Sequence, residues 1–193
     1  MNICLYGASS NEIDKAFITA VELLGEKMAK RGHNLVYGAG ANGLMGAAAR
    51  GVCKGGGKII GVVPKFFNVD GVIFEDCTEL IRPDTMRERK AIMEERADAF
   101  VCTPGGIGTL DEIFEILSLK QLGRHEKAVA LYNVNGYYND ILNMFEKAVS
   151  GKFMSRESAN MLHIFDNPDD LLDYFENYKA DEYDFSVLRK VSK

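Results

Sequence analysis

The sequence predicts one α/β domain built on a doubly wound parallel sheet with helices on both faces. Three observations predict this fold. Short apolar runs alternate with longer segments of helical spacing, a pattern that gives parallel strands joined by right-handed crossovers. The 193 residues match the size of one domain. Glycine-rich turns follow three of the apolar runs, after Tyr6, Tyr37 and Thr103, and sheets of this kind bind ligands at the carboxyl ends of their strands.

The strands and helices can be assigned in order along the chain. Strands are predicted at residues 3–6, 34–37, 58–63, 99–103, 129–132 and 163–165. Helices are predicted at residues 14–31, through 47–49, and at 84–97, 110–122, 137–149 and 168–178. Gly32 suits the end of the first helix and Pro168 the start of the last. Residues 65–83 are predicted to be a loop with short strands. The resulting Rossmann-like domain covers residues 1–179, and residues 180–193 form a tail.

Composition excludes several classes of protein. Hydrophobic residues make up 47% and charged residues 26%, as in soluble globular domains. A net charge of −5 argues against a nucleic-acid polymer as partner but allows a mononucleotide. The start of the chain does not resemble a signal peptide, and no apolar run is long enough to span a membrane. We therefore expect a cytoplasmic protein without membrane contact.

The four cysteines indicate free thiols. Cys4 and Cys102 lie inside predicted strands, and neither Cys53 nor Cys77 belongs to a CxxC pair. Free buried thiols are typical of a reducing cytosol. No cluster of residues has the spacing of a metal site, so we predict no metal and no cofactor. The three histidines flank strands or loops and are assigned structural or surface roles.

The strongest functional motif is Thr103-Pro-Gly-Gly-Ile-Gly-Thr-Leu-Asp-Glu112. A strand ends, three glycines expose backbone amides, and a helix begins, which is the arrangement of an anion site at a helix N-terminus. We predict that a phosphate binds there, with the Thr109 hydroxyl as a further donor. The alternative is an ordinary strand–helix turn in which Thr109 and Glu112 form a capping box. The segment is not a Walker loop, because no Gly-Lys-Ser/Thr follows.

A second motif, Thr85-Met-Arg-Glu-Arg-Lys-Ala-Ile-Met93, places three cations at the start of a helix. Arg87, Arg89 and Lys90 are disfavoured there by the helix dipole unless an anion offsets them. The alternative is a solvated face on which these cations pair with Glu88, Glu94 and Glu95 along the same helix.

A third motif, Gly38-x-Gly40-x-x-Gly43, fits the dinucleotide fingerprint only loosely. The acidic residue expected after the next strand is missing, because Val63 is followed by Pro64 and Lys65. We interpret these glycines as close-packing positions beside a nucleotide. Ser9 and Ser10, after the first strand, are candidate polar contacts to the same ligand.

Taken together, the motifs resemble the signature of the Lonely Guy family. The element PGGxGTxxE matches in full at residues 104–112, and the Arg-Lys dipeptide matches at Arg89-Lys90. Met45-Gly46, Gln121-Leu-Gly123 and Asn135-Gly-Tyr-Tyr138 also match. The likeness covers residues 3–175. Members of this family are phosphoribohydrolases that release the base from cytokinin riboside 5′-monophosphates, and often from AMP.

The resemblance implies Arg89 and Glu112 as the catalytic pair. It also implies a site for the substrate nucleotide, which we assign to Ser9, Gly43, Met45, Gly46, Met86, Lys90, Gly105, Gly106, Gly108 and Thr109. Family members are usually homodimers with the site near the interface. One segment departs from the plant-type members, which carry a glutamate near Phe66-Phe67-Asn-Val-Asp70. We expect that segment to help shape the base pocket.

The chemistry of glycosidic cleavage agrees with this pair. Cleavage of a base–ribose bond builds positive charge on the sugar. A carboxylate at Glu112 can stabilise that charge and activate water, while Arg89 can orient the nucleotide and stabilise the departing base. The alternatives are a nucleotide or molybdenum-cofactor carrier of the same fold, an NAD(P)-dependent oxidoreductase, and a purely structural protein.

Overall fold

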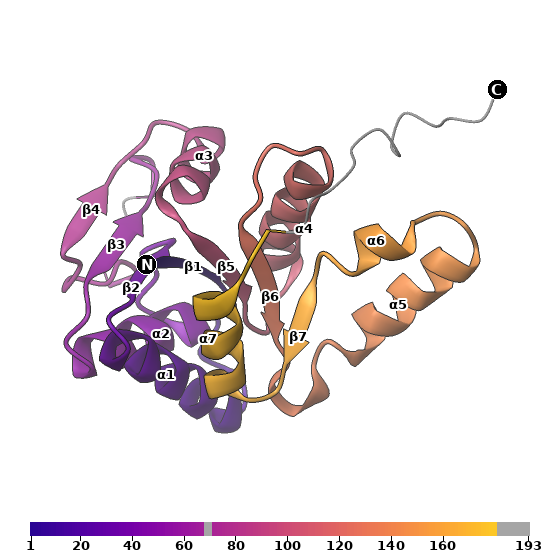
Figure 1. Cartoon of the computed structure of the whole chain (residues 1–193). Helices are drawn as coiled ribbons and strands as arrows, with labels where there is room; N and C mark the ends of the chain where they lie inside the picture. Colours follow the sequence, from indigo (N-terminus) through magenta and orange to yellow (C-terminus); the bar gives the residue numbers. More distant parts are fainter. Residues whose placement is uncertain (68–70, 181–193) are drawn as a thin grey trace.

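The computed structural model describes residues 1–67 and 71–180. Seven parallel strands form one sheet in the order β4-β3-β2-β1-β5-β6-β7 (Figure 1). The strands are β1 (Asn2–Tyr6), β2 (Asn34–Tyr37), β3 (Ile59–Val62), β4 (Glu79–Ile81), β5 (Ala99–Cys102), β6 (Ala128–Tyr132) and β7 (His163–Phe165). The order reverses between β1 and β5, so the predicted doubly wound topology is confirmed.

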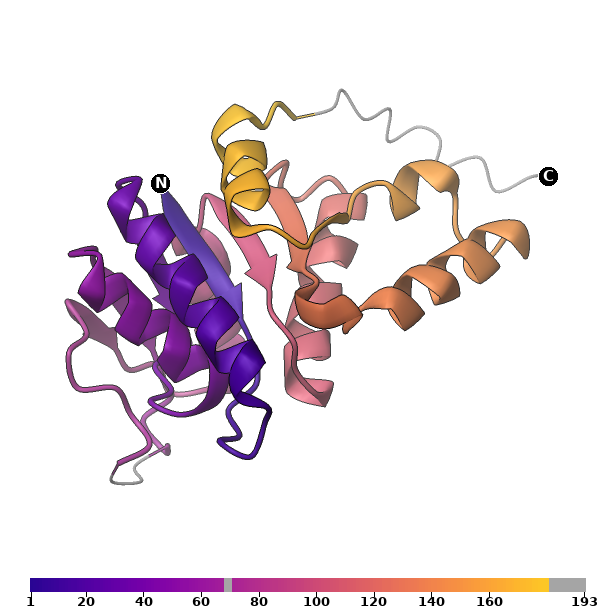
Figure 2. The same cartoon turned by 90° about the horizontal axis from the view of Figure 1, so that it is seen from below.

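Helices cover both faces of the sheet, as predicted. They are α1 (Lys15–Lys30), α2 (Gly43–Lys54), α3 (Met86–Arg96), α4 (Ile107–Gln121), α5 (Asn139–Ser150), α6 (Arg156–Ala159) and α7 (Pro168–Asn177), with a 3₁₀ turn at Val134–Gly136. Buried side chains of α1, α2 and α7 form one core against the sheet. Side chains of α3 and α4 form the other. α1 and α2 lie side by side, and the α5–α6 arm projects from the body (Figures 1 and 2).

The ends of the helices follow from local sequence. Thr85 and Glu88 form a capping box at the start of α3. Asn167 accepts a hydrogen bond from the Asp169 amide, and Pro168 occupies the first position of α7. Gly32, with φ of +79°, follows α1. These caps fix where the chain turns from helix to strand.

Two features differ from the sequence-based expectations, and one prediction gains detail. α4 begins at Ile107 rather than Leu110, because Gly106 serves as its N-cap. The short strand β4 lies in the segment predicted as a loop with short strands and extends the sheet by pairing with β3. The four-residue helix α6 was not predicted. The predicted tail lies outside the described residues beyond Ala180.

The backbone of α1 approaches that of α2 closely. A Cβ on Gly25 would collide with the carbonyl of Ala48, and one on Gly51 would collide with that of Glu22. This packing supports the turns that follow β1 and β2, which enter the site described below. Within the described ranges, no helix is both long and apolar enough to cross a membrane.

Candidate active site

A cavity of about 650 Å³ opens at the switch point of the sheet. The segments that meet there include the turn after β1, the turn after β2, and the first turns of α3 and α4. This is where doubly wound sheets bind their ligands, because the connections from neighbouring strands diverge and leave a crevice. The three motifs singled out in the sequence, which lie between Gly38 and Glu112, therefore converge on one cavity.

Arg89 lies in the first turn of α3 and is buried despite its charge. Its Nε donates to the carbonyl of Val62 at 3.1 Å, and its Nη1 donates to Oε1 of Glu112 at 2.6 Å. A Cβ at Gly38 would collide with the guanidinium, so glycine at that position makes room for the arginine. Close packing was predicted for the glycines of this turn, and the group that packs against Gly38 is the guanidinium of Arg89.

Glu112 faces Arg89 from α4, and the two side chains are only 13% and 10% exposed. Burial raises the pKa of the Glu112 carboxyl, and the positive charge of Arg89 offsets that rise only in part. The capping-box alternative for Thr109 and Glu112 is wrong, because α4 starts at Ile107 and has no side-chain cap. The carboxylate is instead presented to the cavity.

The turn that starts α4 has the properties of an anion site. Gly106 is the N-cap and no side chain caps the helix, so the first amides of α4 have no intrahelical acceptor. A Cβ at Gly106 or Gly108 would meet no atom within 4 Å, and both residues line the cavity together with Thr109. Open space next to exposed amides at a positive helix end is what a phosphate requires.

Arg89 and Lys90 do not pair along their own helix as the alternative interpretation expected. Lys90 Nζ lies 2.7 Å from Asp111 Oδ2 and 2.6 Å from Glu115 Oε2, both on α4. These hydrogen bonds raise the pKa of Lys90. Arg89 likewise pairs across to α4, and it is not solvated. Carboxylates of α4 therefore offset the charge at the start of α3.

The predicted substrate-binding residues divide into two groups. Those that line the cavity are Ser9, Met45, Met86, Lys90, Gly106, Gly108 and Thr109. Gly43, Gly46 and Gly105 lie outside that lining and pack closely against neighbouring atoms: Gly43 against the turn after β1, Gly46 against Ala41, and Gly105 against Thr109.

Sequence reasoning missed several residues of the cavity. Asn42 and Asp111 line it. Asp111 lies inside the PGGxGTxxE element and Asn42 inside the Gly38-x-Gly40-x-x-Gly43 motif, so their positions within these motifs could have indicated both residues. Phe67 also lines the cavity, and it lies in the segment expected from the sequence to shape the base pocket. Of that segment, residues 68–70 lie outside the described residues.

The predictions for histidine and cysteine are confirmed where the structure addresses them. His33 pairs with Glu176 and His125 with the carbonyl of Ile116, both away from the cavity. Cys4 and Cys102 are buried and free. In the part of the chain that the structure describes, no group of three or more His, Cys, Asp or Glu side chains could hold a metal ion.

Comparison with known proteins agrees with this geometry. The model of a family described as "Possible lysine decarboxylase" matches residues 45–175. A "Probable cytokinin riboside 5′-monophosphate phosphoribohydrolase" of Oryza sativa subsp. japonica is 39% identical over 176 residues, which are 91% of this chain and 70% of the relative. The chain belongs to this family, and within it to the Lonely Guy type. A cytokinin riboside 5′-monophosphate phosphoribohydrolase of Arabidopsis thaliana is 36% identical over 95% of this chain and 86% of its own length.

Solved structures of the same fold are more distant in sequence. The molybdenum cofactor binding protein of Rippkaea orientalis superposes with a TM-score of 0.70 at 22% identity, covering 91% of this chain and 94% of its own. The Moco carrier protein of Chlamydomonas reinhardtii gives a TM-score of 0.69 at 21% identity, with the same coverage. At this level of identity the likeness establishes the fold alone. The Lonely Guy relatives, not these structures, define the family.

Proposed function

We propose that this Lonely Guy member hydrolyses the N-glycosidic bond of a nucleoside 5′-monophosphate, releasing the free base and ribose 5-phosphate. AMP and cytokinin riboside 5′-monophosphate are the proposed substrates. One observation carries the proposal: the Arg89–Glu112 pair lies in the same cavity as the uncapped start of α4. The names of the Oryza and Arabidopsis relatives support the same reaction class.

The 5′-phosphate is assigned to the amides of Gly106, Gly108 and Thr109. The helix dipole and the unpaired amides favour a dianion there, and the two glycines leave the space open. Glu112 lies further along the same helix and lines the same cavity. A nucleotide anchored by its phosphate would therefore bring its ribose next to the Glu112 carboxylate.

The reaction follows from these positions. Water attacks C1′ of the ribose, the C1′–N bond to the base breaks, and the bonding electrons leave with the base. Glu112 takes a proton from the attacking water and stabilises the positive charge on the sugar. The proton lost by water balances the one that the departing base acquires. Arg89 orients the carboxylate and stabilises negative charge developing on the base.

The proposal is tested by measuring base and ribose 5-phosphate released from AMP and from a cytokinin riboside 5′-monophosphate. We expect Glu112→Gln to lower kcat by about 100-fold or more, the usual scale for losing a general base. Glu115→Gln is the matched control, because it neutralises a carboxylate one turn further along α4 that pairs with Lys90 and, among the described residues, with no other cation. Equal turnover by wild type and Glu112→Gln would overturn the assignment.

A carrier that binds the nucleotide without turnover is the second candidate, and the fold shared with Moco-binding proteins makes it concrete. The paired carboxylate in the cavity favours hydrolysis, since anion binding alone gains nothing from a buried negative charge. The same assay separates the two, because a carrier would retain intact AMP.

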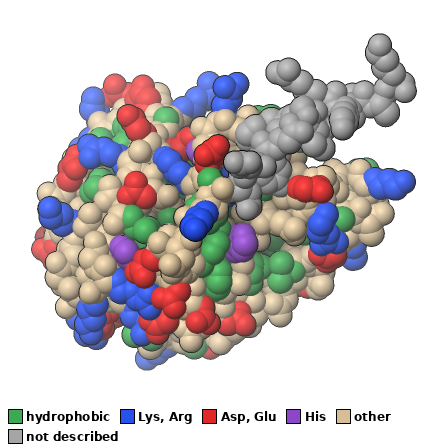
Figure 3. All heavy atoms as spheres, viewed as in Figure 1, with side chains coloured by type: hydrophobic (Ala, Val, Ile, Leu, Met, Phe, Trp, Pro, Cys, Tyr) green, Lys and Arg blue, Asp and Glu red, His purple; other side chains and the backbone are tan. Residues whose placement is uncertain are grey.

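The ligand proposed is a mononucleotide and not a nucleic-acid polymer. Figure 3 shows acidic and basic side chains intermixed on the face it presents, without a continuous basic stripe there. A polymer-binding protein would need such a stripe to neutralise successive phosphates. A single phosphate needs only the local positive end of α4.

We also propose a homodimer. The projecting helix α5 is amphipathic but contains no buried residue, and it exposes Leu142 and Met144, with Phe153 just beyond its end. Exposed apolar side chains on a projecting arm are typical of an interface. Analytical ultracentrifugation should find a dimer that Met144→Lys weakens, and a monomer at micromolar concentration would contradict the proposal.

The proposed location is the cytoplasm. Cys4, Cys53, Cys77 and Cys102 are all free, and burial raises the pKa of the Cys4 and Cys102 thiols to about 12. Such buried, protonated thiols are typical of proteins kept in a reducing compartment. Fractionation of the cells that make the protein would test this.

A further inference from the structure

The connection between β6 and α5 contacts the turn from Thr103 to Gly106 that leads into α4, which we call the phosphate turn. This connection contains Asn135-Gly-Tyr-Tyr138, a motif that the proposed reaction does not use. Tyr137 Oη donates a hydrogen bond to the carbonyl of Gly105 at 2.9 Å, and Tyr138 Oη donates one to the carbonyl of Thr103 at 2.7 Å. Two consecutive tyrosines thus hold two carbonyls of one turn.

A third carbonyl of the turn is held by the backbone. The amide of Ala8 donates to the carbonyl of Pro104 at 3.0 Å. The carbonyls of Thr103, Pro104 and Gly105 therefore all accept hydrogen bonds from groups outside the turn. Each peptide plane through residues 103–106 is fixed in rotation by one of these bonds.

Fixing a carbonyl also fixes the amide that follows it. The chain has no cis peptide bond among its described residues, and in a planar trans peptide the C=O and N–H groups point in opposite directions. The bond from Tyr137 to the Gly105 carbonyl therefore directs the Gly106 amide away from Tyr137. Gly106 lines the cavity. The hydrogen bond from Tyr137 therefore orients the Gly106 amide, a hydrogen-bond donor for the phosphate, although Tyr137 itself does not contact the ligand.

The local backbone is shaped to present both tyrosines. Asn135 and Gly136 adopt positive φ values of 53° and 71°, which suit asparagine and glycine. Asn133 Oδ1 accepts from the Tyr138 amide at 2.7 Å. The two tyrosine rings meet edge to face with centroids 5.0 Å apart, and Tyr137 makes a similar contact with Phe17. These contacts restrict both side chains.

We propose that Tyr137 and Tyr138 are positioning residues that hold the phosphate turn in its binding geometry, and that the Tyr137 hydroxyl sets the affinity for the 5′-phosphate. The inference rests on the proposed function, because it assumes that a phosphate binds at this turn. Tyr138 is fully buried, whereas Tyr137 is 48% exposed, so Tyr137 can be changed with little risk to folding.

The test is Tyr137→Phe, which removes one hydroxyl and leaves the ring contacts. The matched control is Tyr178→Phe, which also removes a hydrogen-bonded hydroxyl, the one contacting Lys120 at 2.7 Å, far from the turn. We expect Tyr137→Phe to weaken binding of ribose 5-phosphate and inorganic phosphate about fivefold to tenfold, as loss of one hydrogen bond implies. KM for AMP should rise by a similar factor, with kcat within about twofold because the chemical step is untouched.

Calorimetric titration and steady-state kinetics measure these effects, and thermal unfolding should show similar losses of stability for the two variants. The inference is overturned if Tyr137→Phe weakens phosphate binding no more than Tyr178→Phe does, or if it lowers kcat and leaves KM unchanged. If the wild type itself binds no ribose 5-phosphate, the proposed function fails and this inference fails with it. If the wild type binds and both variants bind equally well, only this inference fails.

Discussion

Two carboxylates of this chain each pair with an arginine across a helix–helix contact, yet their pKa values move in opposite directions. Glu112 pairs with Arg89 at 2.6 Å, and Asp169 pairs with Arg31 at 2.8 Å. Burial raises the pKa of Glu112. Hydrogen bonds from Lys27 and Arg31 lower the pKa of Asp169. The difference lies in solvation, since the Asp169 side chain is 43% exposed and that of Glu112 is 13% exposed.

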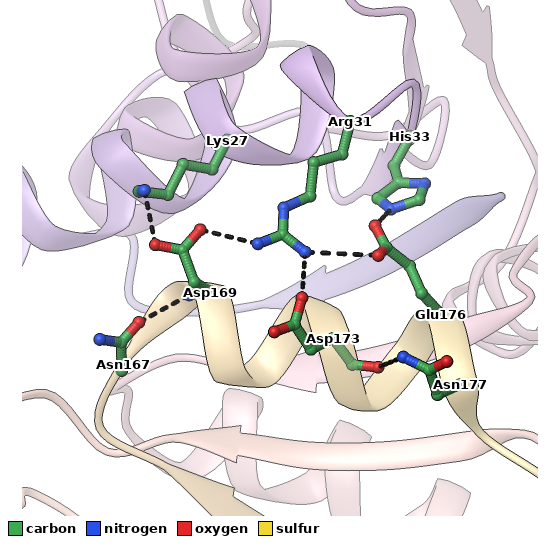
Figure 4. Close-up of polar contacts among 8 residues, drawn as sticks. All are labelled: Lys27, Arg31, His33, Asn167, Asp169, Asp173, Glu176 and Asn177. Atoms are coloured by element: carbon green, nitrogen blue, oxygen red, sulfur yellow. Dashed lines mark hydrogen bonds and ion pairs between the residues drawn. The ribbon is translucent and has the colours of Figure 1, made fainter.

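Figure 4 shows the surroundings of the exposed pair, which we call the α1–α7 network. It joins residues at the end of α1 and in the turn that follows to acidic residues of α7: Lys27, Arg31 and His33 with Asp169, Asp173 and Glu176. Exposed charges keep most of their hydration, so such a network has a small desolvation cost and contributes little to the free energy of unfolding. A buried pair loses that hydration, and this desolvation cost offsets much of the attraction between its charges, so the pair adds little to the stability of the fold. The position of Arg89 and Glu112 in the cavity therefore points to chemistry rather than to folding.

Replacing each arginine in turn should separate the two pairs most clearly. Arg89→Met leaves Glu112 buried without its partner, and we expect it to lower the free energy of unfolding by about 3 kcal/mol and to abolish measurable base release. Arg31→Met should lower stability less and keep activity within about twofold, because exposed pairs contribute little. Urea unfolding and the base-release assay measure both. Equal losses for the two variants would remove the distinction.

The pH dependence should also differ between the two carboxylates. The ionised form of Glu112 is the proposed base, so kcat/KM should rise with pH through its pKa, and the midpoint of that rise should lie above 4.5, the ordinary value. Because the pKa is raised in the folded state, the stability that Glu112 contributes is present below pH 4.5. It is lost as the pH rises through the folded-state pKa. Glu112→Gln should remove that fall in stability. An activity midpoint at or below 4.5 would contradict the assignment.

The contribution of Asp169 to stability should change with pH in the opposite direction to that of Glu112. Its pKa is lowered below the ordinary 3.8, so its contribution is present above pH 3.8 and is lost as pH falls through the folded-state value. Asp169→Asn should flatten the acid side of the stability curve measured by urea unfolding between pH 2.5 and 6, without moving the activity profile. A shift in that profile would show that the network is coupled to the site.

Lys90 is less buried than the Arg89–Glu112 pair, but it lies at the cavity, unlike the α1–α7 network. It is partly exposed and pairs with Asp111 and Glu115. We expect Lys90→Met to raise KM for AMP about threefold to tenfold, the scale of one charge-assisted contact, with kcat nearly unchanged. Steady-state kinetics measure this. A large fall in kcat would place Lys90 in the chemical step.

Salt should produce the smallest effect. At 1 M NaCl the Debye length falls to about 3 Å, so the α1–α7 network should weaken while the buried pair does not. The wild type should lose slightly more thermal stability in salt than the double variant Asp169→Asn/Asp173→Asn, measured by circular dichroism. Identical salt dependence would show that the network contributes nothing measurable.

Most of the fold could be predicted from the sequence because its signals are local. Short strand-like runs of three to six residues, the helical spacing of α1 and the glycine turns are all visible in the chain. The start of α4 was placed three residues late, because a glycine N-cap without a side-chain partner leaves no mark in the sequence. The helix α6 is a single turn, too short for periodicity to reveal.

The candidate site was predicted only in part. The motifs identified Arg89, Glu112 and the phosphate turn, but they did not show that Lys90 pairs with α4 instead of with its own helix. Nor did they show that the two tyrosines of the β6–α5 connection hold the phosphate turn from outside. Both contacts join segments more than 20 residues apart, and spacing within a segment carries no information about them.

By itself the sequence determined the order of strands and helices, the residue types at each strand end and the family of the chain, because propensity and motif spacing are local properties. Only the tertiary structure decided which charges lose their water. Arg89 and Arg31 are the same residue type with the same kind of partner, and the packing around them alone makes one pair a candidate for catalysis and the other a surface contact. Solvation depends on everything that surrounds a group, and that is settled only when the whole chain has folded.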